Sequence, residues 1–130
     1  MLKLHPRSPI AEVVVLAACI DECMACAAWC TICADASAAE DDVAALIRCI
    51  RLCLDCADAC IATARILSRQ TEPDTQTQVM ELEGCLEASR VCAAECERHA
   101  HHNEHCRLSA EECRRRERTC ADLLAALTGS

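Results

Sequence analysis

Cysteine spacing constrains this chain more than any other feature of its sequence. Two runs of cysteines advance in alternating steps of four and three residues, and these steps put the members of each run on one face of an α-helix. The first run is Cys19, Cys23, Cys26, Cys30 and Cys33, and the second is Cys49, Cys53, Cys56 and Cys60. A more dilute run in the second half is Cys85, Cys92, Cys96, Cys106, Cys113 and Cys120. Each run predicts a helix with a stripe of thiols facing a common core.

Composition favours helices and excludes several other classes of protein. The 130 residues include 15 cysteines, one Trp, no Phe or Tyr and only two glycines, whereas a β-sandwich needs aromatic or β-branched strands and frequent turns. A hydrophobic content of 53% disfavours disorder. The net charge of −8 and the lack of stacking aromatic rings disfavour nucleic-acid binding.

Local signals divide the chain into a tail, residues 1–8, and a helical part. Ser8 and Pro9 form a good helix start, residues 37–40 (SAAE) resemble a capping box, and Pro73 ends the second helix. One helix through the whole second half would be about 78 Å long, too long for the first two helices to cover, so we expect a break in the polar run at residues 99–105. The sequence therefore predicts an all-α, up-down antiparallel four-helix bundle with a cysteine-lined core over residues 9–128, with helices near 9–36, 38–69, 75–99 and 103–127.

No stretch of the sequence is expected to span a membrane. The longest apolar run, residues 13–20, is only eight residues long and is bracketed by Glu12 and Asp21. Residues 16–19 (LAAC) resemble a lipoprotein cleavage box, but the apolar segment before them is too short for a signal peptide and is interrupted by prolines. We therefore expect a cytoplasmic protein, whose thiols stay reduced and free to bind metal.

Thiolates three or four residues apart on a helix can hold one soft metal ion between them. Their Cα–Cβ vectors run nearly parallel, which disfavours a disulfide between them. Cu(I) accepts two or three thiolates, whereas structural zinc takes four ligands and ferredoxin-type clusters use Cys-x2-Cys-x2-Cys runs, which do not occur here. Stripes on four helices predict a container for Cu(I); an iron–sulfur electron carrier and a zinc or cadmium sequestering protein are the alternatives. Without a catalytic motif, we expect no enzyme.

The most specific segment is residues 92–106, which read CAAECERHAHHNEHC. Together with the stripes, this segment resembles the cytosolic branch of the four-helix-bundle copper storage proteins, over roughly residues 10–126. The resemblance implies a bundle that loads many Cu(I) ions, commonly as a homotetramer. It also implies within-helix thiolate pairs at Cys19/Cys23, Cys26/Cys30, Cys49/Cys53, Cys56/Cys60 and Cys92/Cys96.

Three positions depart from the expected stripes. Ser89, Ser109 and Arg116 stand where continued spacing of three and four residues would place cysteine.

The basic run at residues 114–118 is expected to be a solvated, ion-paired face. Met24 and Trp29 fall off the stripe, and we expect them at a helix flank or between bundles.

Ligand counting bounds the expected copper load. Two terminal thiolates per ion give about seven Cu(I), and sulfurs that each bridge two ions give about fifteen. A copper chaperone or a low-molecular-weight thiol is the expected donor.

The two ends of the predicted bundle differ. Up-down topology brings the turn near residues 36–41 and the histidine-rich turn to one end, which we interpret as the mouth for copper. His99 lies in the cysteine register, His105 precedes Cys106, and the resemblance favours His101 and His105, so these three histidines join all fifteen cysteines as predicted metal ligands. The other end is expected to be an apolar plug formed by Val13, Val14, Leu16, Ile20, Ile61, Ile66, Leu67, Val79, Leu82, Leu123, Leu124 and Leu127.

Overall fold

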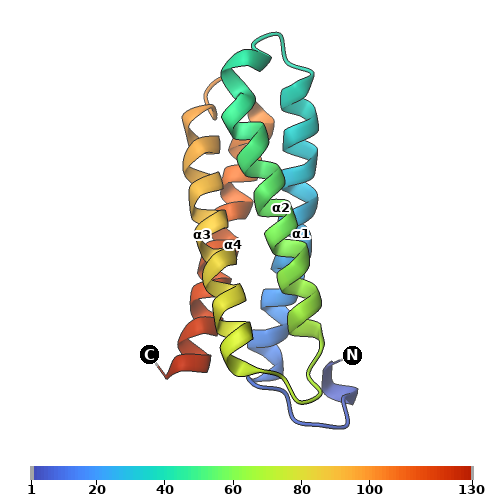
Figure 1. Cartoon of the computed structure of the whole chain (residues 1–130). Coiled ribbons are helices and arrows are strands. Elements are labelled where there is room, and N and C mark those ends of the chain that lie inside the picture. Colours follow the sequence, from blue (N-terminus) through green and yellow to red (C-terminus); the bar gives the residue numbers. More distant parts are fainter. Residues whose placement is uncertain (1, 130) are drawn as a thin grey trace.

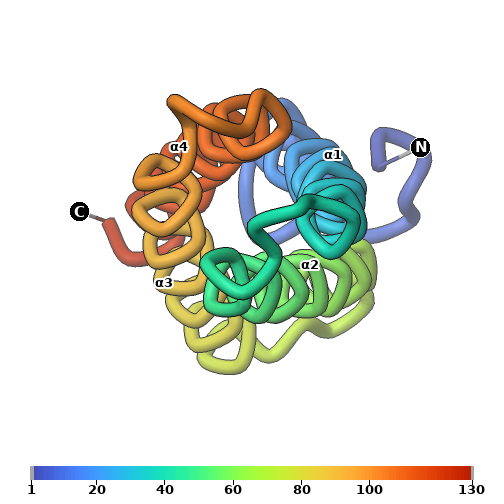
Figure 2. The backbone as a smooth tube through the Cα atoms, turned by 90° about the horizontal axis from the view of Figure 1, so that it is seen from above, coloured from blue at the N-terminus to red at the C-terminus, as the bar shows by residue number. Residues whose placement is uncertain are grey.

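Four helices form an antiparallel bundle in the computed structural model, which describes residues 2–129. The helices are α1 (Val13–Ala38), α2 (Ile47–Ser68), α3 (Thr75–Arg98) and α4 (Glu104–Thr128), with short 3-10 helices η1 (Leu2–Leu4) and η2 (Val43–Leu46). They run alternately up and down (Figure 1). Seen along the bundle (Figure 2), each helix packs against two neighbours in the ring α1, α2, α3, α4. The predicted all-α up-down bundle is confirmed.

The third and fourth helices lie within one residue of their predicted ends. Asp74 caps α3 by accepting a hydrogen bond from the backbone N–H of Thr77 at 3.0 Å. The turn between α3 and α4 falls in the histidine-rich segment, as the length argument predicts. At the end of α4, Gly129 has a positive φ of 74°, the left-handed conformation that commonly ends a helix.

The start of the first helix differs from the prediction. α1 begins at Val13 rather than near residue 9, because the backbone N–H of Ile10 donates to Gln70 Oε1 at 2.9 Å and holds the preceding segment across the end of α2. The predicted tail therefore contacts the bundle: Leu2 packs against the core, and His5 Nε2 lies 3.3 Å from Thr71 Oγ1.

The start of the second helix also differs. α1 continues through Ser37, whose side chain is fully buried with Oγ 4.0 Å from Cys33 Sγ, so the expected capping box does not form. A turn and η2 follow, and α2 begins at Ile47 instead of near residue 38. Leu46, at the end of η2, is fully buried and anchors this connection.

The expectation that no stretch could span a membrane needs correction. α1 has 26 residues and a mean hydropathy of 1.9 in its most apolar window, so it meets the length and composition of a membrane span. A core helix of a bundle meets the same test. Nine of the 26 residues of α1, including its five cysteines, are buried in the bundle, and 33% of the apolar window is buried, so the buried part of α1 is mainly its cysteine stripe.

Four leucines, one from each helix, close the end of the bundle opposite the histidine turn: Leu16, Leu67, Leu82 and Leu123. Each is at most 1% exposed. The predicted apolar plug is narrower than expected, since Val14 and Ile61 are 76% and 42% exposed. We call this end, where both termini also lie (Figure 1), the closed end.

Candidate metal-binding core

All fifteen cysteines point into the bundle. Each is at most 1% exposed, and each is a free thiol. Steps of three, four or seven residues put the cysteines of each helix on one face, and in the ring of four helices each of these faces points toward the bundle axis. Between the leucine layer at the closed end and Leu46 at the other, the interior carries sulfur where most bundle cores have large apolar side chains.

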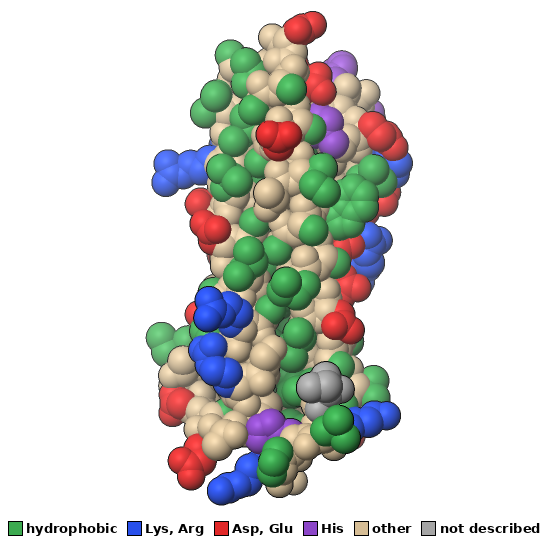
Figure 3. Space-filling view, turned by 90° about the vertical axis from the view of Figure 1, so that its right-hand side faces the viewer, with side chains coloured by type: hydrophobic (Ala, Val, Ile, Leu, Met, Phe, Trp, Pro, Cys, Tyr) green, Lys and Arg blue, Asp and Glu red, His purple; other side chains and the backbone are tan. Residues whose placement is uncertain are grey.

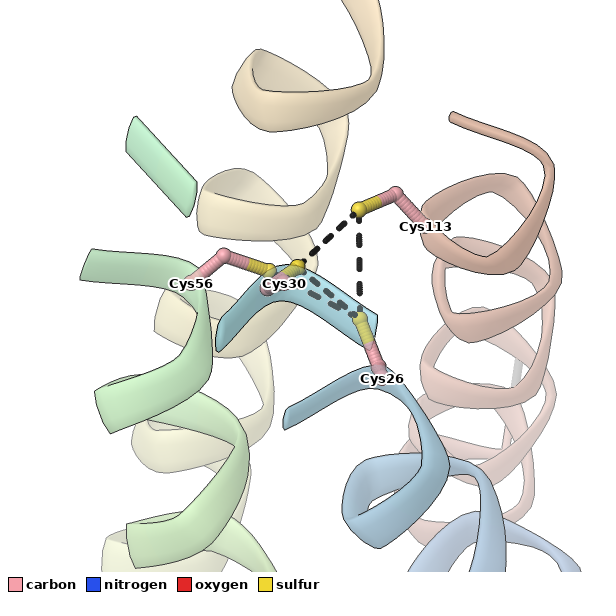
Figure 4. Close-up of side chains that lie close together, drawn as sticks. All are labelled: Cys26, Cys30, Cys56 and Cys113. Carbon is pink, nitrogen blue, oxygen red and sulfur yellow. Dashed lines mark hydrogen bonds between the residues drawn. The ribbon is translucent and has the colours of Figure 1, made fainter. Parts of the chain in front are cut away.

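The middle of the core holds a group of four sulfurs from three helices, which we call the middle cluster (Figure 4): Cys26, Cys30, Cys56 and Cys113. Cys26 Sγ lies 3.8 Å from both Cys30 Sγ and Cys56 Sγ, and Cys113 Sγ lies 3.6 Å from Cys30 Sγ. All four sulfurs are within 4.8 Å of one another. Such a group can bridge several Cu(I) ions without large backbone movement.

A second group of four sulfurs lies nearer the histidine turn: Cys33, Cys49, Cys53 and Cys96. Cys96 Sγ is 3.7 Å from Cys49 Sγ and 3.6 Å from Cys53 Sγ. Cys92 connects this group to the middle cluster, because its sulfur is 3.6 Å from that of Cys53 and 4.0 Å from that of Cys30. The two groups therefore form one continuous run of sulfur.

The mouth of this run is a group of one imidazole and two thiols: Cys33, His105 and Cys106. His105 Nδ1 lies 3.4 Å from Cys33 Sγ and 3.6 Å from Cys106 Sγ, while Nε2 lies 3.1 Å from Glu40 Oε1. Burial opposes the charged form of the ring, but hydrogen bonds to Cys33 and Glu40 outweigh it and raise the pKa of His105. The contact between Glu40 and His105 also shows that the two predicted turns meet at one end.

The other predicted histidine ligands lie farther from sulfur. His99 Nε2 is 2.9 Å from Glu95 Oε2, and this contact holds the imidazole ring at the end of α3. His101 is exposed in the turn. Among the described residues, neither ring belongs to a group of donors within 4.8 Å that includes a cysteine.

Three of the five within-helix pairs implied by the resemblance have sulfurs within 4.0 Å: Cys26/Cys30, Cys56/Cys60 and Cys92/Cys96. Other sulfurs have their near contacts across helices. Cys49 and Cys53 both contact Cys96, for example. A single helix specifies which residues share a face, but only the packing of neighbours decides which sulfurs meet.

The three stripe positions without cysteine also face the core. Ser89 and Ser109 are fully buried, with Oγ atoms 3.8 Å from Cys56 Sγ and 4.0 Å from Cys30 Sγ. Arg116 is fully buried as well. The expectation of a solvated face at residues 114–118 is therefore wrong at Arg116, because it occupies the cysteine register of α4.

Two carboxylates contact the histidines near the mouth: Glu40, which the sequence placed beside the histidine-rich turn, and Glu95, which it did not single out. Glu40 holds the outer nitrogen of His105. Glu95 is 6% exposed and contacts Arg98 at 3.0 Å in addition to His99. Glu95 lies three residues after Cys92 on α3, beside the cysteine face, and this helical spacing is the only sequence signal that could have found it.

Hydrogen bonds between sulfurs, more than burial, shift the pKa values of the thiols in the middle of the core. Hydrogen bonds to Cys113 and Cys30, together with burial, raise the pKa of Cys26. The pKa of Cys92 is raised in the same way, with Cys113 and Cys30 as the leading partners. Such thiols keep their protons until a cation replaces them, so metal binding releases protons and keeps the interior close to neutral.

This fold and this interior define a class of protein: a helical bundle that holds several soft metal ions in a shared thiol lining. A family profile described as copper storage protein matches residues 14–125. The chain belongs to the copper storage protein family.

Solved structures support this assignment. The copper storage protein Ccsp of Streptomyces lividans, loaded with 10 copper equivalents, is 45% identical with a TM-score of 0.93, over 97% of this chain and 96% of that one. A structure of copper loading to a cytosolic copper storage protein of the same organism, with five coppers, is 48% identical with a TM-score of 0.85, over 86% and 93% of the two chains. A Ccsp mutant with one histidine replaced by alanine is 47% identical with a TM-score of 0.89, over 90% and 98%. Among curated proteins, none matches.

Proposed function

We propose that this chain is a cytosolic Cu(I) store that holds about seven to fifteen ions, the range set by terminal and by bridging thiolates. The observation that carries this proposal is the continuous run of buried sulfurs from the middle cluster to the mouth. A site for one metal would need three or four ligands and would leave most of these cysteines unexplained. The related Ccsp structures carry five and 10 coppers, and one of them is described as cytosolic.

We propose the His105 end as the route for copper. His105 lies between solvent and two sulfurs. Its side chain is 20% exposed, and its Nδ1 atom faces Cys33 and Cys106. Imidazole binds Cu(I) less strongly than thiolate does, so an ion captured here passes inward. All fifteen cysteines are proposed ligands, with His105 as the leading imidazole and His99 and His101 as secondary candidates. A copper chaperone or a small thiol is the proposed donor.

We also propose a homo-oligomer, with a tetramer as the expected size. Nine large apolar side chains are exposed among the described residues, and seven of them lie on α1 and α2: Val14, Met24, Trp29, Ile32, Ile47, Leu54 and Ile61. The face seen in Figure 3 carries hydrophobic side chains along much of its length. Exposed apolar surface concentrated on two helices is typical of an interface between chains.

Anaerobic titration of the reduced apoprotein with Cu(I) tests the storage function. We expect ultraviolet sulfur-to-copper charge-transfer absorption to rise linearly until many equivalents are bound. A plateau after one or two equivalents would contradict storage. Visible colour and redox activity of the isolated protein would favour the iron–sulfur alternative, and tighter binding of Zn(II) or Cd(II) than of Cu(I) would favour the third.

A further inference from the structure

Arg116 places a buried cation inside the cysteine core. Its side chain is 0% exposed and is the largest of the fully buried side chains in residues 2–129. The guanidinium donates from Nη2 to Cys19 Sγ at 3.3 Å and to Cys120 Sγ, and from Nη1 to Thr119 Oγ1 at 2.5 Å. A fixed positive charge therefore lies beside the closed-end cluster, which we define as Cys19, Cys23, Cys85 and Cys120.

Within the core, Arg116 makes its hydrogen bonds with sulfur and with Thr119 rather than with a carboxylate. Its neighbours Arg114 and Arg115 pair with Glu97 and Glu112, but among the ion pairs of residues 2–129 none involves Arg116. Glu22 on α1 lies close enough to interact with its charge, but neither Glu22 Oε2 nor Arg116 Nε has a hydrogen-bond partner among residues 2–129. A guanidinium stays charged when buried and requires electron-rich partners nearby, and the sulfurs of Cys19 and Cys120 accept its hydrogen bonds.

Elsewhere in the core, copper itself supplies the balancing charge. Each Cu(I) that binds displaces one thiol proton to water and stays in the +1 state, so one ion neutralises one thiolate. At the closed end, one of these charges is already present on Arg116. The donor groups that lie within 4.8 Å of one another in residues 2–129 all lie in the middle and at the mouth, and none includes a closed-end cysteine.

We propose that Arg116 takes the place of one Cu(I) ion in the closed-end cluster, so that this cluster binds fewer copper ions than it has thiolates. The proposal rests on the storage function argued above. It assigns Arg116 a role in copper stoichiometry: the guanidinium holds a thiolate by charge and hydrogen bonds and excludes a metal ion from its own position. The two ends of the core then have different effects on copper: His105 admits Cu(I) at one end, and Arg116 limits the number of bound ions at the other.

Saturation titrations of Arg116→Met and Arg116→Lys against a colorimetric Cu(I) chelator test this role. Met is long and uncharged, whereas Lys keeps the charge and serves as the matched control. We expect the Met variant to bind about one more Cu(I) per chain than the wild type, and the Lys variant to match the wild type. Far-ultraviolet circular dichroism checks that both variants are helical. Equal or lower capacity in a folded Met variant, or a gain in the Lys variant, would overturn the proposal.

Copper-edge anomalous diffraction from fully loaded wild-type crystals gives a second test that needs no variant. We expect about three Cu(I) ions among the four closed-end sulfurs, with the guanidinium still bonded to Cys19 or Cys120. A copper ion at the guanidinium position, with Arg116 displaced toward solvent, would refute the inference. A wild type that binds few ions anywhere would instead refute the storage function, so the two failures are distinguishable.

Discussion

His105 and His101 differ in their contacts although both belong to the same turn. His105 touches two sulfurs, and His101 is exposed. We expect His105→Ala to slow the first phase of Cu(I) uptake by about tenfold or more and to lower capacity by about one ion, because it removes an imidazole donor at the mouth. Stopped-flow mixing with a Cu(I) donor measures both.

Two controls separate rate from capacity in that experiment. His101→Ala is expected to have a smaller effect, because its ring has no sulfur neighbour among the described residues. Cys26→Ser with Cys30→Ser is expected to lower capacity and leave early uptake nearly intact, because both thiols lie in the middle cluster. Unchanged kinetics in His105→Ala would place the copper route at the closed end or between helices.

Glu95 links stability to pH near the mouth. Burial disfavours its charged form, but His99 and Arg98 outweigh burial and lower the pKa of Glu95. A carboxylate with a lowered folded-state pKa stabilises the fold above its unfolded pKa, and this contribution is lost as pH falls through the folded value. We expect Glu95→Gln to reduce the unfolding free energy of the apoprotein by about 1–3 kcal/mol at pH 7. The deficit should shrink at pH 4 in urea titrations; a constant deficit would indicate that packing is responsible.

At the scale of helices, periodicity predicted the stripes and their common axis because every turn of a helix repeats the same geometry. It could not predict the ends governed by tertiary contacts. α1 starts late because Ile10 bonds to Gln70, sixty residues away, and Ser37 enters the core instead of capping a helix. The same limit applies to the site: the register identified Arg116 as a stripe position, but only the neighbouring helices show that Cys19 contacts it.

The leucine layer that closes the bundle separates stability from copper capacity. Leu82 on α3 is fully buried, so Leu82→Ala leaves a cavity and is expected to cost about 2–5 kcal/mol of unfolding free energy. Cu(I) capacity should remain that of the wild type at temperatures where the variant is folded, because no ligand is lost. Met80→Ala, at a position 61% exposed on the same helix, is the matched control and should change stability by about 0.5 kcal/mol or less.

At the scale of the whole molecule, the apolar side chains on α1 and α2 predict the state of association. Met24 and Ile32, two turns apart on α1, are 53% and 57% exposed. We expect Met24→Glu with Ile32→Glu to shift the protein toward monomers in light scattering after size-exclusion chromatography, because two buried charges oppose an apolar interface. Met80→Glu on α3, at a position 61% exposed, is the control and should leave the oligomer intact. A wild type that is already monomeric would contradict the proposed assembly.

The bundle also determines how folding and copper are coupled. Its helices have tertiary packing without metal: leucines close one end, and alanines such as Ala27, Ala57 and Ala93 lie buried between the helices. We therefore expect the reduced apoprotein to give a helical far-ultraviolet circular dichroism spectrum, unlike a zinc finger, whose fold requires its ion. Copper binds the folded arrangement of sulfurs far better than a disordered chain, so the melting temperature should rise with each addition of Cu(I) until saturation. The coil spectrum of an unfolded apoprotein would show instead that copper organises the bundle, and a constant melting temperature would place the bound ions outside the folded core.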